Sequence, residues 1–166
     1  MSENEQEQRM ARPRMAAGAV FFDAQGRILL VRPSYKPMWE IPGGYIETGE
    51  SPLSACRREV EEELGITPPI GALLVVDWAP NEAEGDKVLY LFDGGEMSSN
   101  TAATIKLASA ELLAAEFHAV EDLDQLLIPR LVRRVKQAMA ARKQGLPVYL
   151  EHGEPPNAHF RKIYPR

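Results

Sequence analysis

The stretch that decides the fold runs over residues 44–66 and reads GYIETGESPLSACRREVEEELGI. Ser51 is a good N-cap, because its hydroxyl accepts a hydrogen bond from a free N–H of the first helical turn. Pro52 fits the first helical position, where no N–H is needed. Gly65 suits a left-handed C-terminal cap. The sequence therefore predicts a helix over residues 52–64.

This helix has two faces of different character. Apolar residues recur at intervals of three and four and predict a face that packs on the core: Leu53, Cys56, Val60 and Leu64. Glu59, Glu62 and Glu63 lie together on another face, where each like-charged pair repels by roughly 0.2–0.5 kcal/mol. The helix macrodipole also disfavours anions in this C-terminal half. A hard divalent cation reverses that cost, so the acidic face predicts a Mg²⁺ or Mn²⁺ site.

A solvated acidic face is the alternative explanation for three neighbouring glutamates. It does not account for the residues at fixed distances around them, which are Gly43, Gly44, Glu50, Arg58 and Gly65. Taken together, the segment resembles the Nudix box, G-x5-E-x7-R-E-U-x-E-E-x-G-U, in which U is aliphatic. Every specified position is filled, by Gly44, Glu50, Arg58, Glu59, Val60, Glu62, Glu63, Gly65 and Ile66. The preceding WEIPGG at residues 39–44 resembles the usual lead-in of the family.

The resemblance implies a hydrolase that cleaves the diphosphate of a nucleoside diphosphate linked to another moiety, X, with Mg²⁺ or Mn²⁺ as cofactor. It implies metal ligands at the glutamates and at a backbone carbonyl of the glycine pair: Glu59, Glu62, Glu63 and Gly43 or Gly44. Arg58 would join the glutamates in catalysis by orienting a ligand carboxylate. Glu50 and Gly65 would brace the loop-helix-loop. Metal bound there would neutralise the diphosphate and lower the pKa of a bound water.

The general base is open at this stage. Glu59 is the first choice within the box, as ligand and base. Glu111 and Glu116 are candidates for a later glutamate that reaches the site, with a solvated role as the alternative for each. His118 qualifies by residue type alone.

The substrate-binding residues are predicted from aromatic and basic side chains near the box. Tyr35, Trp39 and Trp78 could stack on a base or sugar, and Lys36 could pair with phosphate. The family markers for ADP-ribose or dinucleoside polyphosphates, a proline or tyrosine about sixteen residues beyond the box, are both missing, since Glu82 stands there. X therefore stays open among a nucleotide sugar, ADP-ribose and a nucleoside triphosphate. A catalytically weak nucleotide-binding regulatory module on the same fold is the alternative function.

Composition narrows the partners. The 166 residues suit one domain, and a net charge of −5 gives no electrostatic footprint for nucleic acid. We expect a small-molecule nucleotide substrate and no nucleic-acid or membrane partner, because no apolar run is long enough to span a bilayer. Cys56 is the single cysteine, which excludes an intrachain disulfide and fits a cytoplasmic protein.

The chain divides into three parts. Residues 1–14 are rich in Glu, Gln and Arg and are expected to be disordered. Residues 15–144 form the Nudix domain, and residues 145–166 form a tail that packs on the domain or reaches a partner subunit, which leaves a homodimer open. Within the domain we expect strands over 16–22, 27–32, 45–47, 71–78, 87–92 and 112–120 and a second, basic helix over 129–143. With the family resemblance, this order indicates an α/β/α sandwich around a mixed sheet.

Overall fold

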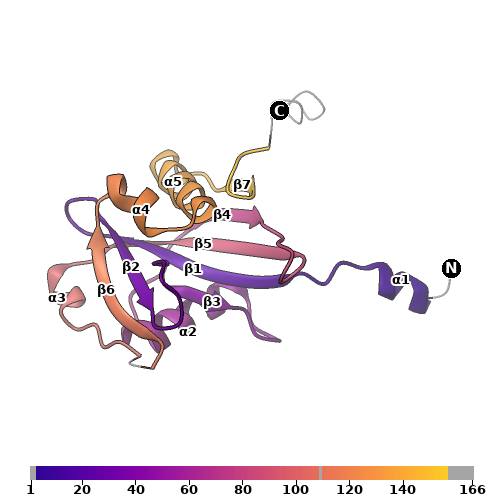
Figure 1. The fold of residues 1–166 in the computed structure, drawn as a ribbon, viewed down its shortest axis with the longest axis horizontal. Helices are drawn as coiled ribbons and strands as arrows, with labels where there is room; N and C mark the ends of the chain where they lie inside the picture. Colours follow the sequence, from indigo (N-terminus) through magenta and orange to yellow (C-terminus); the bar gives the residue numbers. More distant parts are fainter. Residues whose placement is uncertain (1–2, 109, 157–166) are drawn as a thin grey trace.

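A computed structural model describes residues 3–108 and 110–156 of the chain (Figure 1). The main helices are α2 (Pro52–Leu64) and α5 (Pro129–Gln144), and the strands are β1 (Arg14–Phe22), β2 (Ile28–Pro33), β3 (Gly43–Tyr45), β4 (Leu73–Trp78), β5 (Lys87–Glu96), β6 (Leu112–His118) and β7 (Val148–Glu151). Shorter helical elements are α1 (Glu3–Arg9), α3 (Ser99–Ala102), the 3-10 turn η1 (Val120–Asp122) and α4 (Leu123–Leu126).

The strands form one seven-stranded mixed sheet in the order β6-β2-β1-β5-β4-β7, with β3 paired to β1 away from this path. The β1–β5 and β4–β7 pairs are parallel, and the other pairs are antiparallel. Helix α2 covers one face of the sheet, and α4 and α5 cover the other (Figure 1). The α/β/α sandwich with a mixed sheet is confirmed.

Each face of the sheet has its own apolar core, because successive residues of β1 point to opposite sides. Val20 and Phe22 belong to the core under α5, together with Val135. Ala19 and Phe21 belong to the core under α2. The sheet is thus buried on both faces, and this fixes the two helices relative to each other.

Helix α2 begins and ends where its capping residues predict. The Ser51 hydroxyl accepts a hydrogen bond from Ser54 N at 3.1 Å, and Pro52 occupies the first turn. Gly65 adopts the left-handed conformation, with φ of 64°, and its N–H donates to the carbonyl of Glu61. Local sequence therefore sets both ends of the helix that carries the box.

Other elements differ from the sequence-based expectation. Strand β3 lies two residues earlier than the expected 45–47, because the glycine pair itself pairs with Ala17 and Gly18 of β1. Residues 3–9 form helix α1 within the segment expected to be disordered. Glu and Gln favour a helix by local propensity, and residues 4–9 are exposed.

The tail begins by packing on the domain. Strand β7 pairs in parallel with β4, from Val75–Val148 to Trp78–Glu151. The rest of the tail, which includes His159, Phe160 and Tyr164, lies outside the described residues, and a contact with a partner subunit stays a prediction. Nowhere in 3–108 or 110–156 is there a helix long and apolar enough to cross a bilayer.

Candidate functional site

The site is organised around the glycine pair at the start of β3. Gly43 has a φ of +150°, and a Cβ built there would lie 2.5 Å from the carbonyl oxygen of Ala17. A Cβ on Gly44 would lie 2.4 Å from Cδ of Glu59. Position 43 therefore requires glycine for its conformation, whereas a side chain at position 44 would displace the Glu59 carboxylate from the backbone of β3.

Arg58 joins the loop before α2 to two of the box glutamates. Its Nε and Nη2 donate to the two carboxylate oxygens of Glu50 at 2.7 and 2.9 Å. Nη1 donates to Glu59 Oε1 at 2.8 Å and to Glu62 Oε2 at 3.1 Å. Nη2 also donates to the carbonyl of Tyr45 at 3.0 Å. Because a guanidinium has five N–H donors, Arg58 is fully hydrogen-bonded within the protein.

Glu50 is held firmly as an anion. The hydrogen bonds from Arg58, followed by one from the N–H of Glu47, lower the pKa of Glu50 to about 2. In turn, the hydrogen bonds to Glu50, followed by the one to Glu59, raise the pKa of Arg58. The pair is thus a permanent charged brace between the loop and the helix, in the place where the sequence predicted one.

Glu59 and Glu63 differ from Glu50, because their surroundings raise the pKa instead of lowering it. Burial raises the pKa of Glu59, although the hydrogen bond from Arg58 opposes the rise. Burial raises the pKa of Glu63 to about 8 against a hydrogen bond from Gly43 N at 3.0 Å, and nearby Glu59, Glu40 and Glu111 add to the rise. The carboxylates beside the glycine pair therefore lack the positive partners that would favour their ionised form, and a bound cation would favour that form.

This donor set fits a divalent cation in its chemistry. Across residues 3–108 and 110–156, no three His, Cys, Asp or Glu side chains already converge on one point as a metal-binding group. Glu62 has 60% of its side chain exposed and reaches Arg58 through one oxygen only, as Glu59 does. Each carboxylate keeps its second oxygen for another partner. Hard oxygen donors in excess of nearby positive charge are what Mg²⁺ and Mn²⁺ bind.

The two candidate glutamates outside the box lie in different places. Glu111, just before β6, raises the pKa of both Glu59 and Glu63 by its charge, after burial as the main cause. Ala115 and Phe117 of β6 pack on the α2 side of the sheet, so Glu116 points to the other face. His118 makes an edge-to-face contact with Trp39, with ring centroids 4.7 Å apart. Glu111 is the candidate that the fold brings towards the box.

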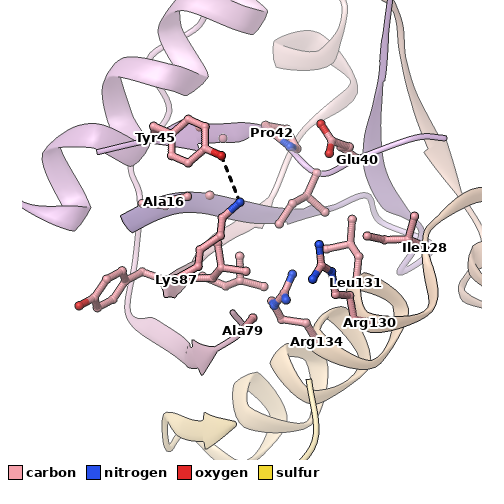
Figure 2. A pocket seen from close by; sticks show the side chains of 18 of the residues that line it. Ala16, Glu40, Pro42, Tyr45, Ala79, Lys87, Ile128, Arg130, Leu131 and Arg134 are labelled. Carbon is pink, nitrogen blue, oxygen red and sulfur yellow. Dashed lines mark hydrogen bonds between the residues drawn. The ribbon is translucent and has the colours of Figure 1, made fainter. Parts of the chain in front are cut away.

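A cleft of about 370 Å³ opens beside the glycine pair, between the sheet and the N-terminal half of α5 (Figure 2). Its walls include residues from β1, the loop 35–45, β5 and α5. Of the predicted substrate-binding residues, Tyr35 and Lys36 line it. Trp39 packs against His118, and Trp78 lies on β4, so neither lines this cleft.

Several charged residues of the cleft, among them Glu84, were not predicted as site residues from the sequence. Glu40 lines the cleft and accepts a hydrogen bond from Lys36 Nζ at 2.5 Å. Its charge also adds to the rise in the pKa of Glu63. Arg130 and Arg134 line it from α5. In the sequence they belong to a basic helix without acidic residues, for which a solvated face is the favoured interpretation and a phosphate or dimer contact is the alternative.

Comparison with known proteins agrees with this geometry. The NUDIX domain family model matches residues 12–141. The chain belongs to the NUDIX family. A likeness in fold extends to a MutT protein from Methanosarcina mazei Go1, with a TM-score of 0.65 and 24% identity, covering 82% of this chain and 98% of that one.

Curated relatives match shorter stretches. The chain is 31% identical over 85 residues to an RNA pyrophosphohydrolase of Roseobacter denitrificans, covering 49% of this chain and 53% of the relative. It is 29% identical over 112 residues to an ADP-ribose pyrophosphatase of Methanocaldococcus jannaschii, covering 63% of this chain and 61% of the relative. These matches thus span between half and two thirds of the length of each relative.

Proposed function

We propose that this NUDIX protein is a divalent-metal-dependent hydrolase that cleaves the diphosphate of a nucleoside diphosphate linked to X. The observation that carries the proposal is the placement of Glu59 and Glu63 against the Gly43–Gly44 backbone, at the edge of the cleft, with Arg58 bracing the arrangement. The names of the relatives support the reaction class. They include both an RNA pyrophosphohydrolase and an ADP-ribose pyrophosphatase, so X remains a question for experiment.

Glu59, Glu62 and Glu63 would hold the metal, with a backbone oxygen of the glycine pair as a further donor. When bound, Mg²⁺ or Mn²⁺ supplies charge neutralisation at the diphosphate and acidifies a bound water. Arg58 keeps the Glu59 and Glu62 carboxylates oriented, and this limits the reorganisation needed when the metal binds.

We propose that one of two glutamates takes the proton of the attacking water. Glu59 is one, as the sequence suggested. Glu111 is the other, since its charge acts on both Glu59 and Glu63 from outside the box. In either case the carboxylate oxygen would accept the proton as the water attacks phosphorus.

The test compares Glu63→Gln with Glu61→Gln, which removes an exposed carboxylate from the neighbouring position of the same helix. Substrates would be ADP-ribose, UDP-glucose, GTP and 5′-triphosphorylated RNA, each with Mg²⁺, with Mn²⁺ and with a chelator. We expect Glu63→Gln to lower kcat by about a hundredfold or more, as for loss of a group that holds the catalytic ion. Glu61→Gln should retain normal turnover.

A second readout is independent of turnover. Mg²⁺ should raise the melting temperature of the wild-type protein and of Glu61→Gln but not of Glu63→Gln, because a ligand stabilises only the state that binds it. Turnover that persists in the chelator would contradict the proposal. Nucleotide binding without turnover of any substrate would favour the regulatory module instead.

A further inference from the structure

The N-terminus of α5 faces the cleft without a polar cap. Ile128 occupies the N-cap position and makes no side-chain hydrogen bond to the helix, and Pro129 begins the first turn. No acidic residue lies in that turn. Ile128, Arg130 and Leu131 all line the cleft. The positive end of the helix dipole is therefore uncompensated by the protein on this side.

Arg134 lies one turn further along α5 and also lines the cleft, and one nitrogen of its guanidinium has no hydrogen-bond acceptor among the described residues. It is 5% exposed, and its Nε donates to Asp77 Oδ2 at 2.5 Å. The other oxygen of Asp77 accepts from Gly153 N at 3.1 Å, so the carboxylate is fully occupied. Nη2 of Arg134 is buried and has no hydrogen-bond partner among the described residues. Figure 2 shows this guanidinium directed from α5 into the cleft.

Arg130 supplies unpaired charge beside that donor. It lies four residues before Arg134 and therefore on the same face of α5. Other cations lining the cleft each contact an acid: Lys36 with Glu40, Lys87 with Glu84 and Arg134 with Asp77. Arg130 makes no hydrogen bond or ion pair within the described part of the chain, and its guanidinium also points into the cleft (Figure 2).

We propose that Arg130, Arg134 Nη2 and the N-terminus of α5 form an anion subsite that binds a phosphate or carboxylate group carried by X. A buried N–H without a partner is costly, and an anionic oxygen in hydrogen-bonding range satisfies it while pairing with Arg130. At the N-terminus of α5, Pro129 has no N–H and the N–H groups of Leu131 and Val132 donate to the carbonyl of Ile128. The helix therefore contributes mainly the positive end of its dipole to the subsite.

The place of the subsite in the cleft indicates which part of the substrate would bind there. Pro42 and Tyr45, which flank the glycine pair in the sequence, lie across the cleft from Arg130 and Arg134 (Figure 2). Under the proposed function, the diphosphate to be cleaved lies at the glycine pair. The group on α5 is then a second anion of the same substrate. This inference rests on the proposed function for its assignment to X, whereas anion binding by α5 does not depend on it.

The first experiment titrates the metal-free full chain with inorganic phosphate and follows backbone and arginine side-chain resonances by NMR. The largest shifts are expected at Arg130, Leu131 and the Arg134 guanidinium. Arg130→Gln should weaken phosphate binding by about tenfold, as for loss of one charge-assisted contact. Lys143→Gln removes the same charge from the last turn of α5 and should leave binding unchanged. Shifts confined to other residues, or equal affinity in Arg130→Gln, would overturn the subsite.

The second experiment compares substrates that differ by one anionic group on X: UDP-glucose with UDP-glucuronate for a carboxylate, and ADP-ribose with ADP-ribose 1″-phosphate for a phosphate. We expect the anionic member of a pair to have the higher kcat/KM and to lose this advantage in Arg130→Gln but not in Lys143→Gln. Turnover without such a preference would overturn the assignment to X and leave the hydrolase standing. Phosphate binding at Arg130 without any turnover would overturn the hydrolase and leave the anion subsite standing.

Discussion

Each side of the cleft has an arginine with acidic partners, and the two arginines differ in how completely they are hydrogen-bonded. On the β3 side Arg58 does not itself line the cleft but lies on α2 behind it, in what we call the β3–α2 wall, and it donates all of its N–H groups to protein oxygens. On the α5 wall, Arg134 binds Asp77 and keeps Nη2 without a partner. The saturated arginine can only position its neighbours. The unsaturated one can still bind something that enters the cleft.

The carboxylates of the two walls also differ in how completely they are hydrogen-bonded, and here the better-bonded one lies on the α5 wall. Asp77 has both oxygens occupied, by Arg134 and by the N–H of Gly153. Glu59 and Glu63 have raised pKa values, chiefly from burial, and too few donors around them. One wall therefore has excess negative charge and the other has unused positive groups. A phosphate ester with a bound metal complements both, since the metal meets the acidic wall and an anionic group meets the basic one.

The largest expected effect comes from breaking the buried pair of the α5 wall. Asp77→Asn keeps the size of the side chain but leaves the charge of Arg134 buried without compensation. We expect the free energy of unfolding to fall by about 3–5 kcal/mol, the usual cost of removing one partner of a buried ion pair. Chemical denaturation with urea measures it.

The matched control is Asp124→Asn, which removes the partner of Lys136 from an exposed pair. It should change the free energy of unfolding by only about 0–1 kcal/mol. Similar values for the two variants would mean that solvent already reaches Arg134, and the difference between the two walls would then disappear.

A smaller effect on stability, with a larger one on activity, is expected from the saturated arginine. Arg58→Gln frees Glu50, Glu59 and Glu62 at once. Arg58 is only partly buried, so we expect a loss of about 1–2 kcal/mol in the free energy of unfolding. Activity should fall much further, because the carboxylates lose their orientation. Arg57→Gln, an exposed neighbour, should change neither quantity. A variant at Arg58 that kept full turnover would show that the brace is dispensable.

The β3–α2 wall was predictable from sequence because its interactions are local. Ser51, Glu50, Arg58 and Gly65 act within one loop and one helix, so their spacing fixes their geometry. The α5 wall was not predictable, because Arg134 meets Asp77 over 57 positions of sequence and only after β4 and α5 pack together. The glycine pair was predictable only in part. Its role beside Glu59 followed from the motif, but its place in β3 depends on pairing with β1.

The smallest effect is a pH dependence that belongs to the saturated wall. The folded pKa of Glu50 lies at about 2, below its ordinary value of 4.5. A depressed folded pKa means that the unfolded chain binds the proton first as the pH falls. The Glu50–Arg58 pair therefore stabilises the protein fully at pH values above the ordinary pKa of 4.5, and the stabilisation is lost as the pH falls towards about 2.

Glu50→Gln should show a shallower fall in melting temperature than the wild type as the pH falls from 4.5 towards about 2. Glu47→Gln, which removes an exposed carboxylate from the same loop, should follow the wild type, and equal slopes for all three proteins would show that Arg58 does not hold Glu50 as an anion in solution.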